Sequence, residues 1–252
     1  MRSFVRGLVV AAAVVAVWWA LSALHLWTAY VLPPPERVWH AAVAMTTSGE
    51  LPEHVVVSLG RVAAGFGIAF GLAFTLGMLG SALPRPTAYL TPVLSFLRNV
   101  PPLALIPLLI VWFGIGETAK LVVIVLTAFF PMYMSTTKGL RACSPQLLDV
   151  GAVRHFSPAR TLLLIRLPSA VPDILVGMRI SLGYAWRALV GAEMIAAASG
   201  LGYLVLDAQE MSRSDKVIVG IVAIGLIGMA SDRLFALLVR RALRWGIDDS
   251  WR

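Results

Sequence analysis

Arg179, Arg187 and Glu193 lie in one long apolar stretch of this 252-residue chain, between residues 174 and 201. At about 100° per residue they fall within roughly 120° of arc on one face of a helix. Charged groups inside a bilayer are costly and usually face a cavity or a partner, and an arginine beside a pathway attracts an oxyanion through paired N–H donors. Arg187, its neighbour Trp186 and Glu193 are therefore candidates for lining a solute pathway. The structural alternative is that Arg187 and Glu193 pair with each other or with another helix.

A second set of candidates interrupts the apolar sequence near residue 100. Proline cannot continue a helix and restricts the residue before it, so Pro101 and Pro102 are predicted to break a helix there. Irregular backbone at membrane depth is tolerated where it lines a cavity. Asn99, Pro101 and Pro102 are therefore candidates for shaping a gate.

The composition places these residues in a membrane protein. Of all residues 59% are hydrophobic and 13% are charged, and the mean hydropathy is +0.83, whereas a soluble domain carries about 25% charged residues. Disorder is excluded because disordered chains are poor in apolar residues. The single cysteine, Cys143, excludes a disulfide within the chain and a multi-cysteine metal cluster. The net charge of +8 does not require nucleic acid, because Lys and Arg also orient membrane helices.

The fold class is predicted to be an all-α membrane protein, surrounded by lipid, with about six transmembrane helices. Each span takes roughly 20 mostly apolar residues. The third is the least regular, because prolines and a polar pair of residues interrupt it. The six stretches are 7–27, 62–83, 86–116, 121–137, 174–201 and 217–239.

The distribution of Lys and Arg predicts a multi-pass protein with both termini in the cytoplasm. With an even number of spans, most basic residues fall on the inner side. The apolar run at the N-terminus is longer than an ordinary signal-peptide core of about 7–15 residues, so we expect a retained helix rather than cleavage. Pro35 is predicted to open a short external helix. The connections on the outer side receive only Arg37, Lys120, Arg213 and Lys216.

The longest predicted cytoplasmic connection, residues 138–168, contains two helix starts. Ser144-Pro145 and Ser157-Pro158 each place an N-cap serine before a proline at the first helical position. The second helix is predicted to end before Pro168. Two short amphipathic helices cannot span a membrane, so the segment is either a solvated linker or a docking element for a cytosolic partner.

This connection resembles the cytoplasmic EAA loop of ABC-importer permeases, whose pattern is E-A-A-x-x-x-G-x(9)-I-x-L-P. Ile165, Leu167 and Pro168 fall where the pattern requires them. The resemblance covers about residues 30–245. Three further stretches resemble the sulfonate, nitrate and taurine permease subfamily, namely residues 100–107, 112–117 and 192–204.

The connection departs from the EAA pattern at three positions. Asp149 stands in place of Glu, Gly151 in place of the second Ala, and His155 in place of Gly. A glycine at a helix end readily adopts the left-handed conformation, which histidine adopts only at a cost. We therefore expect a slightly different turn at His155, with the role of the loop unchanged.

The resemblance implies a type I ABC importer permease fold in a bacterial inner membrane, with coupling helices between spans four and five. It implies two cytosolic ABC ATPase subunits, a second permease subunit in a homodimer and an external substrate-binding protein as partners. ATP is used by the partner subunits, and this chain, which has no G-x-x-x-x-G-K-[ST] phosphate loop, is not expected to bind a cofactor or to be an enzyme. The implied coupling residues are Leu148, Asp149, Val150, Gly151, His155, Phe156, Ser157, Ile165, Leu167 and Pro168.

The predicted organisation has four parts. They are an N-terminal transmembrane helix (1–30), an external loop with a short helix (31–61), a permease core (62–245) that includes the coupling loop 144–168, and a cytoplasmic tail (246–252).

The implied function is transport of a small anionic solute, of the aliphatic sulfonate, taurine or nitrate type. A vitamin precursor or another small organic solute is the alternative. A secondary transporter is more distant, because it would need inverted repeats and several membrane carboxylates, and Glu193 is the only carboxylate in an uninterrupted span. A membrane enzyme would need convergent catalytic groups or metal ligands, which four scattered His and one Cys do not supply.

Overall fold

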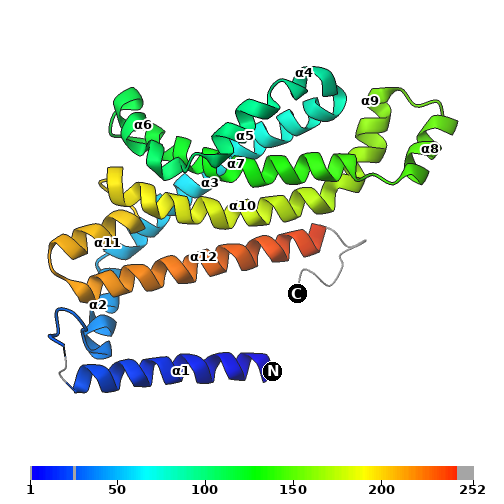
Figure 1. The fold of residues 1–252 in the computed structure, drawn as a ribbon. Helices are drawn as coiled ribbons and strands as arrows, with labels where there is room; N and C mark the ends of the chain where they lie inside the picture. The colour runs from blue at the N-terminus through cyan, green and yellow to red at the C-terminus, as the bar shows by residue number, and fades with distance from the viewer. Residues whose placement is uncertain (1, 25–26, 243–252) are drawn as a thin grey trace. The chain divides into compact units, whose positions relative to one another are not determined.

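The structure is a computed structural model that describes residues 2–24 and 27–242. The predicted tail, 246–252, and the last residues of the predicted core, 243–245, lie outside the described residues. The described chain consists of helices and their connections, without a strand (Figure 1), which confirms the all-α prediction. The elements are α1 (Arg2–Ala23), α2 (Pro35–Thr47), α3 (Glu50–Ala82), α4 (Pro84–Ala88), α5 (Thr91–Asn99), the 3-10 helix η1 (Pro102–Leu105), α6 (Ile106–Phe113), α7 (Glu117–Arg141), α8 (Pro145–Val153), α9 (Pro158–Thr161), the π-helix η2 (Leu162–Arg166), α10 (Leu167–Ala196), α11 (Leu201–Glu210) and α12 (Ser214–Ala242).

Four helical segments are long and apolar enough to cross a membrane: α3, α7, α12 and the continuous run Pro158–Ala196. Residues 85–99 and 102–113 form a pair bent by 87°, which gives a fifth span if the pair crosses as one. Helix α1 contains a shorter apolar segment, Ala12–Ala23. The described residues thus hold four or five candidate spans and the shorter apolar helix α1, where about six spans were predicted.

The described chain forms two compact units, one from residues 2–24, 27–58 and 198–226 and the other from residues 59–197 and 227–242. In the first unit, α2 begins at Pro35, as predicted. Its buried face packs Ala41 and Met45 against Leu204 of α11 and Val219 of α12.

The second unit is built on α7 and α10, which run side by side (Figure 1). Small residues allow their close approach: a Cβ on Gly177 would lie 2.4 Å from Ser135 Cβ and 3.1 Å from the Pro131 carbonyl oxygen. The buried Ser181 hydroxyl donates to the Ala128 carbonyl at 2.7 Å. Small residues and hydroxyls at a helix contact are typical of membrane helices, where hydrocarbon solvent gives no hydrophobic drive between helices.

Two predicted helix boundaries are wrong. The helix that starts after Ser157 does not end before Pro168 but continues to Ala196. The π-helix η2 directly precedes α10, and Pro168 lies in the first turn of α10; the wider hydrogen-bond pattern accommodates a residue that lacks an N–H. The fifth span ends at Ala196 and not at residue 201, because Ala197 is extended and Gly200 has a φ of 112°.

Candidate functional site

The predicted coupling segment, residues 144–168, forms α8, α9, η2 and the start of α10. Ser144 Oγ accepts a hydrogen bond from the Leu147 N–H, and Ser157 Oγ accepts one from the Arg160 N–H, each at 3.4 Å. A proline follows each serine in the first turn of its helix. Both predicted N-caps are confirmed.

Helix α8 ends in a Schellman turn at His155. The Phe156 N–H donates to the Gly151 carbonyl and the His155 N–H to the Ala152 carbonyl, both at 2.9 Å. His155 has a φ of 50°, in the left-handed region where glycine is usual. The expectation of a different turn is therefore wrong: histidine adopts the glycine conformation, at a cost of roughly 1–2 kcal/mol.

Helix α8 packs on η2 by one face and leaves the other face uncovered. Gly151 is buried, and a Cβ at this position would lie 2.7 Å from Ile165 Cδ1. On the other side, the side chains of Leu147, Val150 and Val153 are 46%, 56% and 79% exposed. Residues at three-residue spacing share one face of a helix, so these three form a continuous exposed apolar strip.

The other predicted coupling residues lie outside this strip. Leu148, Phe156, Ile165 and Leu167 are half-buried and hold the segment together. The exposed members are Asp149, His155, Ser157 and Pro168.

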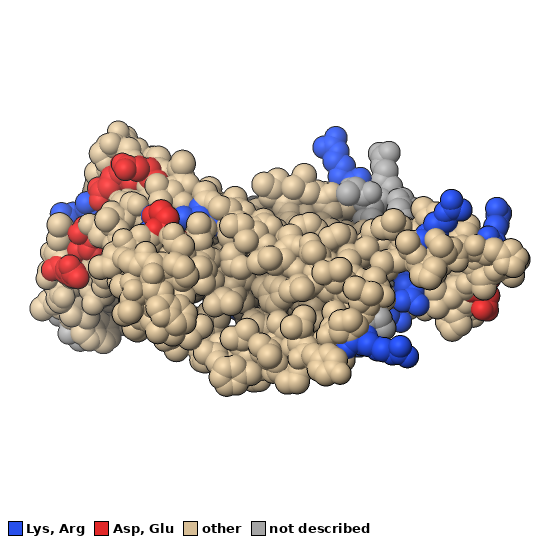
Figure 2. Space-filling model, turned by 90° about the horizontal axis from the view of Figure 1, so that it is seen from above, with Lys and Arg blue, Asp and Glu red and all other residues tan. Residues whose placement is uncertain are grey.

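Basic side chains gather at the end of the second unit that carries α8 and α9 (Figure 2). Lys138 and Arg141 lie in the last turn of α7, and Arg154 and Arg160 lie in the coupling segment; all four are exposed. A concentration of Lys and Arg of this kind is typical of connections on the cytoplasmic side of a membrane protein.

At the other end of α7, four charged side chains form a partly buried ion cluster. Arg61 on α3 donates from Nη1 to Glu193 Oε1 at 2.7 Å and from Nε and Nη2 to both oxygens of Glu117, also at 2.7 Å. Lys120 Nζ donates to Glu117 Oε1 at 2.7 Å. Arg61 is 6% exposed and Glu193 is 0% exposed, whereas the side chain of Glu117 is 59% exposed. Arg61 therefore joins α3 to α7 through Glu117 and to α10 through the fully buried Glu193.

The pathway candidates on α10 do not share one environment. Glu193 pairs with Arg61 and not with Arg187, which corresponds to the structural alternative of pairing with another helix. Arg187 is exposed, with its guanidinium 5.7 Å from the centre of the Tyr184 ring. Trp186 is buried, at 8% exposure. Of the predicted set on α10, only Arg187 presents its charged group at the surface of this chain.

Arg179 lies in a salt bridge with α12. Its Nε and Nη2 each donate to one oxygen of Asp232 at 2.8 Å. A bidentate pair of this kind fixes both side chains and leaves fewer donors for a solute.

Asn99, Pro101 and Pro102 lie at the break between α5 and η1. The Asn99 side-chain amide donates to the Ser95 carbonyl at 2.7 Å and so closes the last turn of α5. Pro101 is extended, with a φ of −61° and a ψ of 120°. The predicted interruption of the helix at this point is confirmed, and the chain bends by 87° across it.

Arg61 was not predicted as the partner of Glu193, nor were Glu117 and Lys120 predicted as the other members of the cluster. Two features of the sequence point toward them: Arg61 is the single cation immediately before a long apolar stretch, and Glu193 is a carboxylate that needs compensation inside a span. Because Arg61 and Glu193 are 132 residues apart, no local spacing rule connects them.

Several known proteins are similar to this chain over most of its length. A putative aliphatic sulfonates transport permease protein of Bacillus subtilis is 38% identical over 242 residues, which cover 96% of this chain and 88% of that protein. The taurine transport system permease protein of Escherichia coli is 36% identical and covers 93% of this chain and 87% of its own length. The bicarbonate transport system permease protein of Synechococcus elongatus is 34% identical and covers 75% of this chain and 68% of its own length.

A solved structure shows the same fold. An inward-facing conformation of the MetNI methionine ABC transporter superposes with a TM-score of 0.58 at 17% identity, covering 72% of this chain and 93% of that chain. The family described as binding-protein-dependent transport system inner membrane component matches residues 67–244. The chain therefore belongs to this family, the permease subunits of ABC importers, which work with separate ATPase subunits and have no ATPase site of their own.

Proposed function

We propose that this chain forms the translocation pathway of an importer for a small anion of the aliphatic sulfonate or taurine type, and that partner ATPases dock on α8. The observation that carries the proposal is the exposed apolar strip of Leu147, Val150 and Val153 on a helix that is otherwise fixed to the fold. An apolar helix face of this kind suits a hydrophobic groove on a partner protein.

The local construction of α8 suits the transmission of movement. Both ends of the helix are fixed, by the Ser144 cap and by the Schellman turn at His155, and its inner face is in contact with Ile165. The run Pro158–Ala196 is continuous from this segment into the membrane helix α10. A push on α8 therefore acts on a long helix as a rigid body, which is the kind of movement that alternating access requires.

The same segment supports the proposed orientation in the membrane. The exposed Lys and Arg around α8 support placing this end in the cytoplasm, with both chain termini on that side. A second copy of this chain and an external substrate-binding protein complete the proposed importer. Each copy of the chain binds one ATPase through its α8.

The choice of a sulfonate or taurine type of solute is supported by the named activities of two relatives that match most of this chain. Arg187 supplies the matching chemistry, since a guanidinium offers paired N–H donors to an oxyanion. Nitrate and a vitamin precursor are the other solutes to be tested.

The proposal is tested by uptake into proteoliposomes. The chain is reconstituted with a candidate ATPase and a candidate binding protein, and uptake of labelled taurine and methanesulfonate is followed with ATP on the ATPase side. We expect uptake only when all three components and ATP are present. Solute uptake by the purified chain alone, without nucleotide, would refute the proposal.

The role of α8 is tested in the same assay with two variants at one position. Val150→Asp places a charge in the apolar strip and is expected to lower uptake by at least about tenfold, since burying an unpaired charge costs several kcal/mol. The control, Val150→Ile, keeps the strip apolar and is expected to retain uptake.

A further inference from the structure

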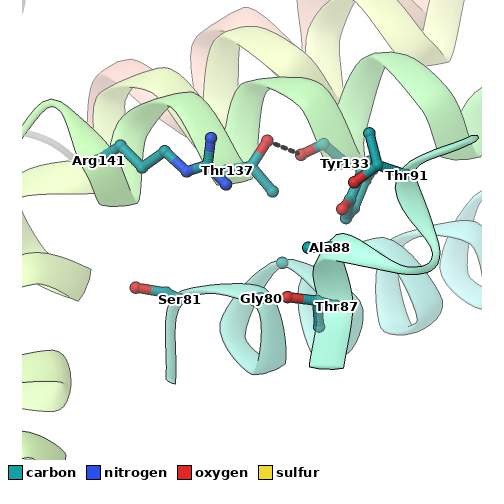
Figure 3. A pocket seen from close by; sticks show the side chains of 9 residues that line it. Gly80, Ser81, Thr87, Ala88, Thr91, Tyr133, Thr137 and Arg141 are labelled. Atoms are coloured by element: carbon teal, nitrogen blue, oxygen red, sulfur yellow. Dashed lines mark hydrogen bonds between the residues drawn. The ribbon is translucent and has the colours of Figure 1, made fainter. Parts of the chain in front are cut away.

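A polar cavity of about 110 Å³ lies between α3, α4, α5 and α7 in the second unit. Figure 3 shows Tyr133, Thr137 and Arg141 along α7, across the opening from Gly80 and Ser81 of α3. The lining contains one guanidinium, five hydroxyls and no carboxylate. It is formed by Gly77, Gly80, Ser81, Thr87, Ala88, Thr91, Tyr133, Thr137 and Arg141.

The hydrogen bonds of the lining show which hydroxyls are left to donate. Thr87 and Thr137 each donate to a backbone carbonyl of the preceding turn, at 2.8 Å and 2.9 Å, so their protons are committed. Ser81 Oγ accepts from Arg166 Nη1 at 3.4 Å, which leaves its own proton available. Within the described part of the chain, the Tyr133 hydroxyl has no hydrogen-bond partner and is available as well.

Positive charge surrounds these donors. Arg141 is exposed at the end of α7 and forms no ion pair with any described residue. Arg166 lies directly behind Ser81. Thr91 is the first residue of α5, and the N-terminal end of a helix carries the positive end of the helix dipole. A cation, free hydroxyl donors and a helix N-terminus without an opposing carboxylate favour an anion.

We propose that this cavity binds the oxyanion group of a sulfonate, a sulfate or a phosphate, with Arg141 and Tyr133 as its principal donors. The volume suits one small oxyanion group, since a water molecule occupies about 30 Å³ of liquid. Such a group comes either from a free solute or from a phospholipid headgroup. Arg141 ends α7 three residues before Ser144, the cap of α8, so the site lies next to the coupling segment.

Binding is measured on the purified full-length chain, without ATPase, in nanodiscs of neutral lipid. The probes are labelled sulfate and methanesulfonate, with chloride as the background anion; a sulfonate is chosen on the basis of the proposed function. We expect saturable binding. Arg141→Gln should weaken it on the order of 10- to 100-fold, because charge-assisted hydrogen bonds are the strong ones.

Three further variants separate binding from folding. Tyr133→Phe removes the hydroxyl but keeps the ring stacked on Phe129, with centroids 5.5 Å apart, and should weaken binding about two- to tenfold. Gly80→Leu should abolish binding by filling the cavity, because a Cβ there has room, 3.8 Å from Thr87 Oγ1. Arg85→Gln removes an exposed cation outside the lining and should change affinity less than about twofold.

The source of the oxyanion is distinguished by repeating the titration in nanodiscs that contain phosphatidylglycerol. If the lipid displaces sulfate, and the Arg141→Gln variant no longer binds the lipid, the site is assigned to a phospholipid headgroup. If sulfate binding is unchanged by the lipid, the site is assigned to a free solute. No saturable binding of either kind, or equal binding by wild type and Arg141→Gln, overturns the proposal. This titration measures binding and not transport, so its result is independent of the uptake assay. If the cavity binds sulfate but the reconstituted importer takes up no taurine, the proposed substrate is refuted and the cavity assignment is not.

Discussion

Replacing Arg61 by methionine is expected to destabilise this protein strongly. Arg61 donates to the fully buried Glu193 at 2.7 Å, in an ion pair between two buried side chains. Removing one partner of a buried ion pair costs about 3–5 kcal/mol, because the other charge is left without compensation. For a chain of this size, that corresponds to a fall of roughly 6–20 °C in melting temperature.

The second step of the experiment separates the pair from the packing. In Arg61→Met/Glu193→Met both charges of the buried pair are gone, and stability should return to within about 2 kcal/mol of wild type, because apolar replacements of buried pairs are often neutral. Glu193→Gln should be milder than Arg61→Met, since Arg61 keeps its two bonds to the exposed Glu117.

Thermal unfolding of each variant is measured in one detergent, by tryptophan fluorescence and by loss of soluble protein. An Arg61→Met variant as stable as wild type would refute the reasoning. A double variant no more stable than Arg61→Met would also refute it, because the loss would then come from packing of the Arg61 side chain rather than from an uncompensated charge.

Three further outcomes are expected. Gly177→Ala should lower the free energy of unfolding of this protein by about 1–3 kcal/mol, because the added Cβ clashes with Ser135 of α7. Gly183→Ala on the same helix, where a Cβ has nothing within 4 Å, should be neutral or stabilising; both are measured by thermal unfolding. His155→Gly should raise stability by about 1 kcal/mol in chemical unfolding and leave uptake unchanged, because glycine relieves the left-handed strain; lower stability would contradict this. Arg187→Ala should lower uptake of the anion about tenfold at equal expression, and full uptake by both it and Arg187→Lys would remove Arg187 from the pathway.

Features set by neighbouring residues were predictable from the sequence. The Ser144 and Ser157 caps, the start of α2 at Pro35 and the interruption at Pro101 each depend on a residue and its immediate neighbours. The long apolar stretches likewise predict helices, because a chain in lipid must satisfy its backbone groups within the segment.

Features set by packing or by adjacent helices were not predictable. Pro168 stays inside a continuous helix because a π-helix precedes it, and composition does not reveal that hydrogen-bond pattern. His155 keeps the glycine conformation because the two hydrogen bonds of the Schellman turn and the contact of Gly151 with Ile165 hold it.

The ion cluster shows the same limit at longer range. The sequence places Glu193 and Arg187 on one helix face, but only the arrangement of α3 against α10 decides that Glu193 meets Arg61. The face of a helix is a local property, whereas the neighbour on that face is not.

Cross-linking tests whether α8 transmits the work of a partner ATPase. In a Cys143→Ser background, Val153→Cys places one thiol on the most exposed residue of the apolar strip. Treatment of the assembled importer with a short thiol-to-amine cross-linker is predicted to join this chain to the ATPase subunit and to stop ATP-driven uptake. Uptake that continues at the wild-type rate after the cross-link has formed would show that α8 does not transmit this work. The absence of any cross-link to the ATPase in an active importer would show that the ATPase does not dock on α8.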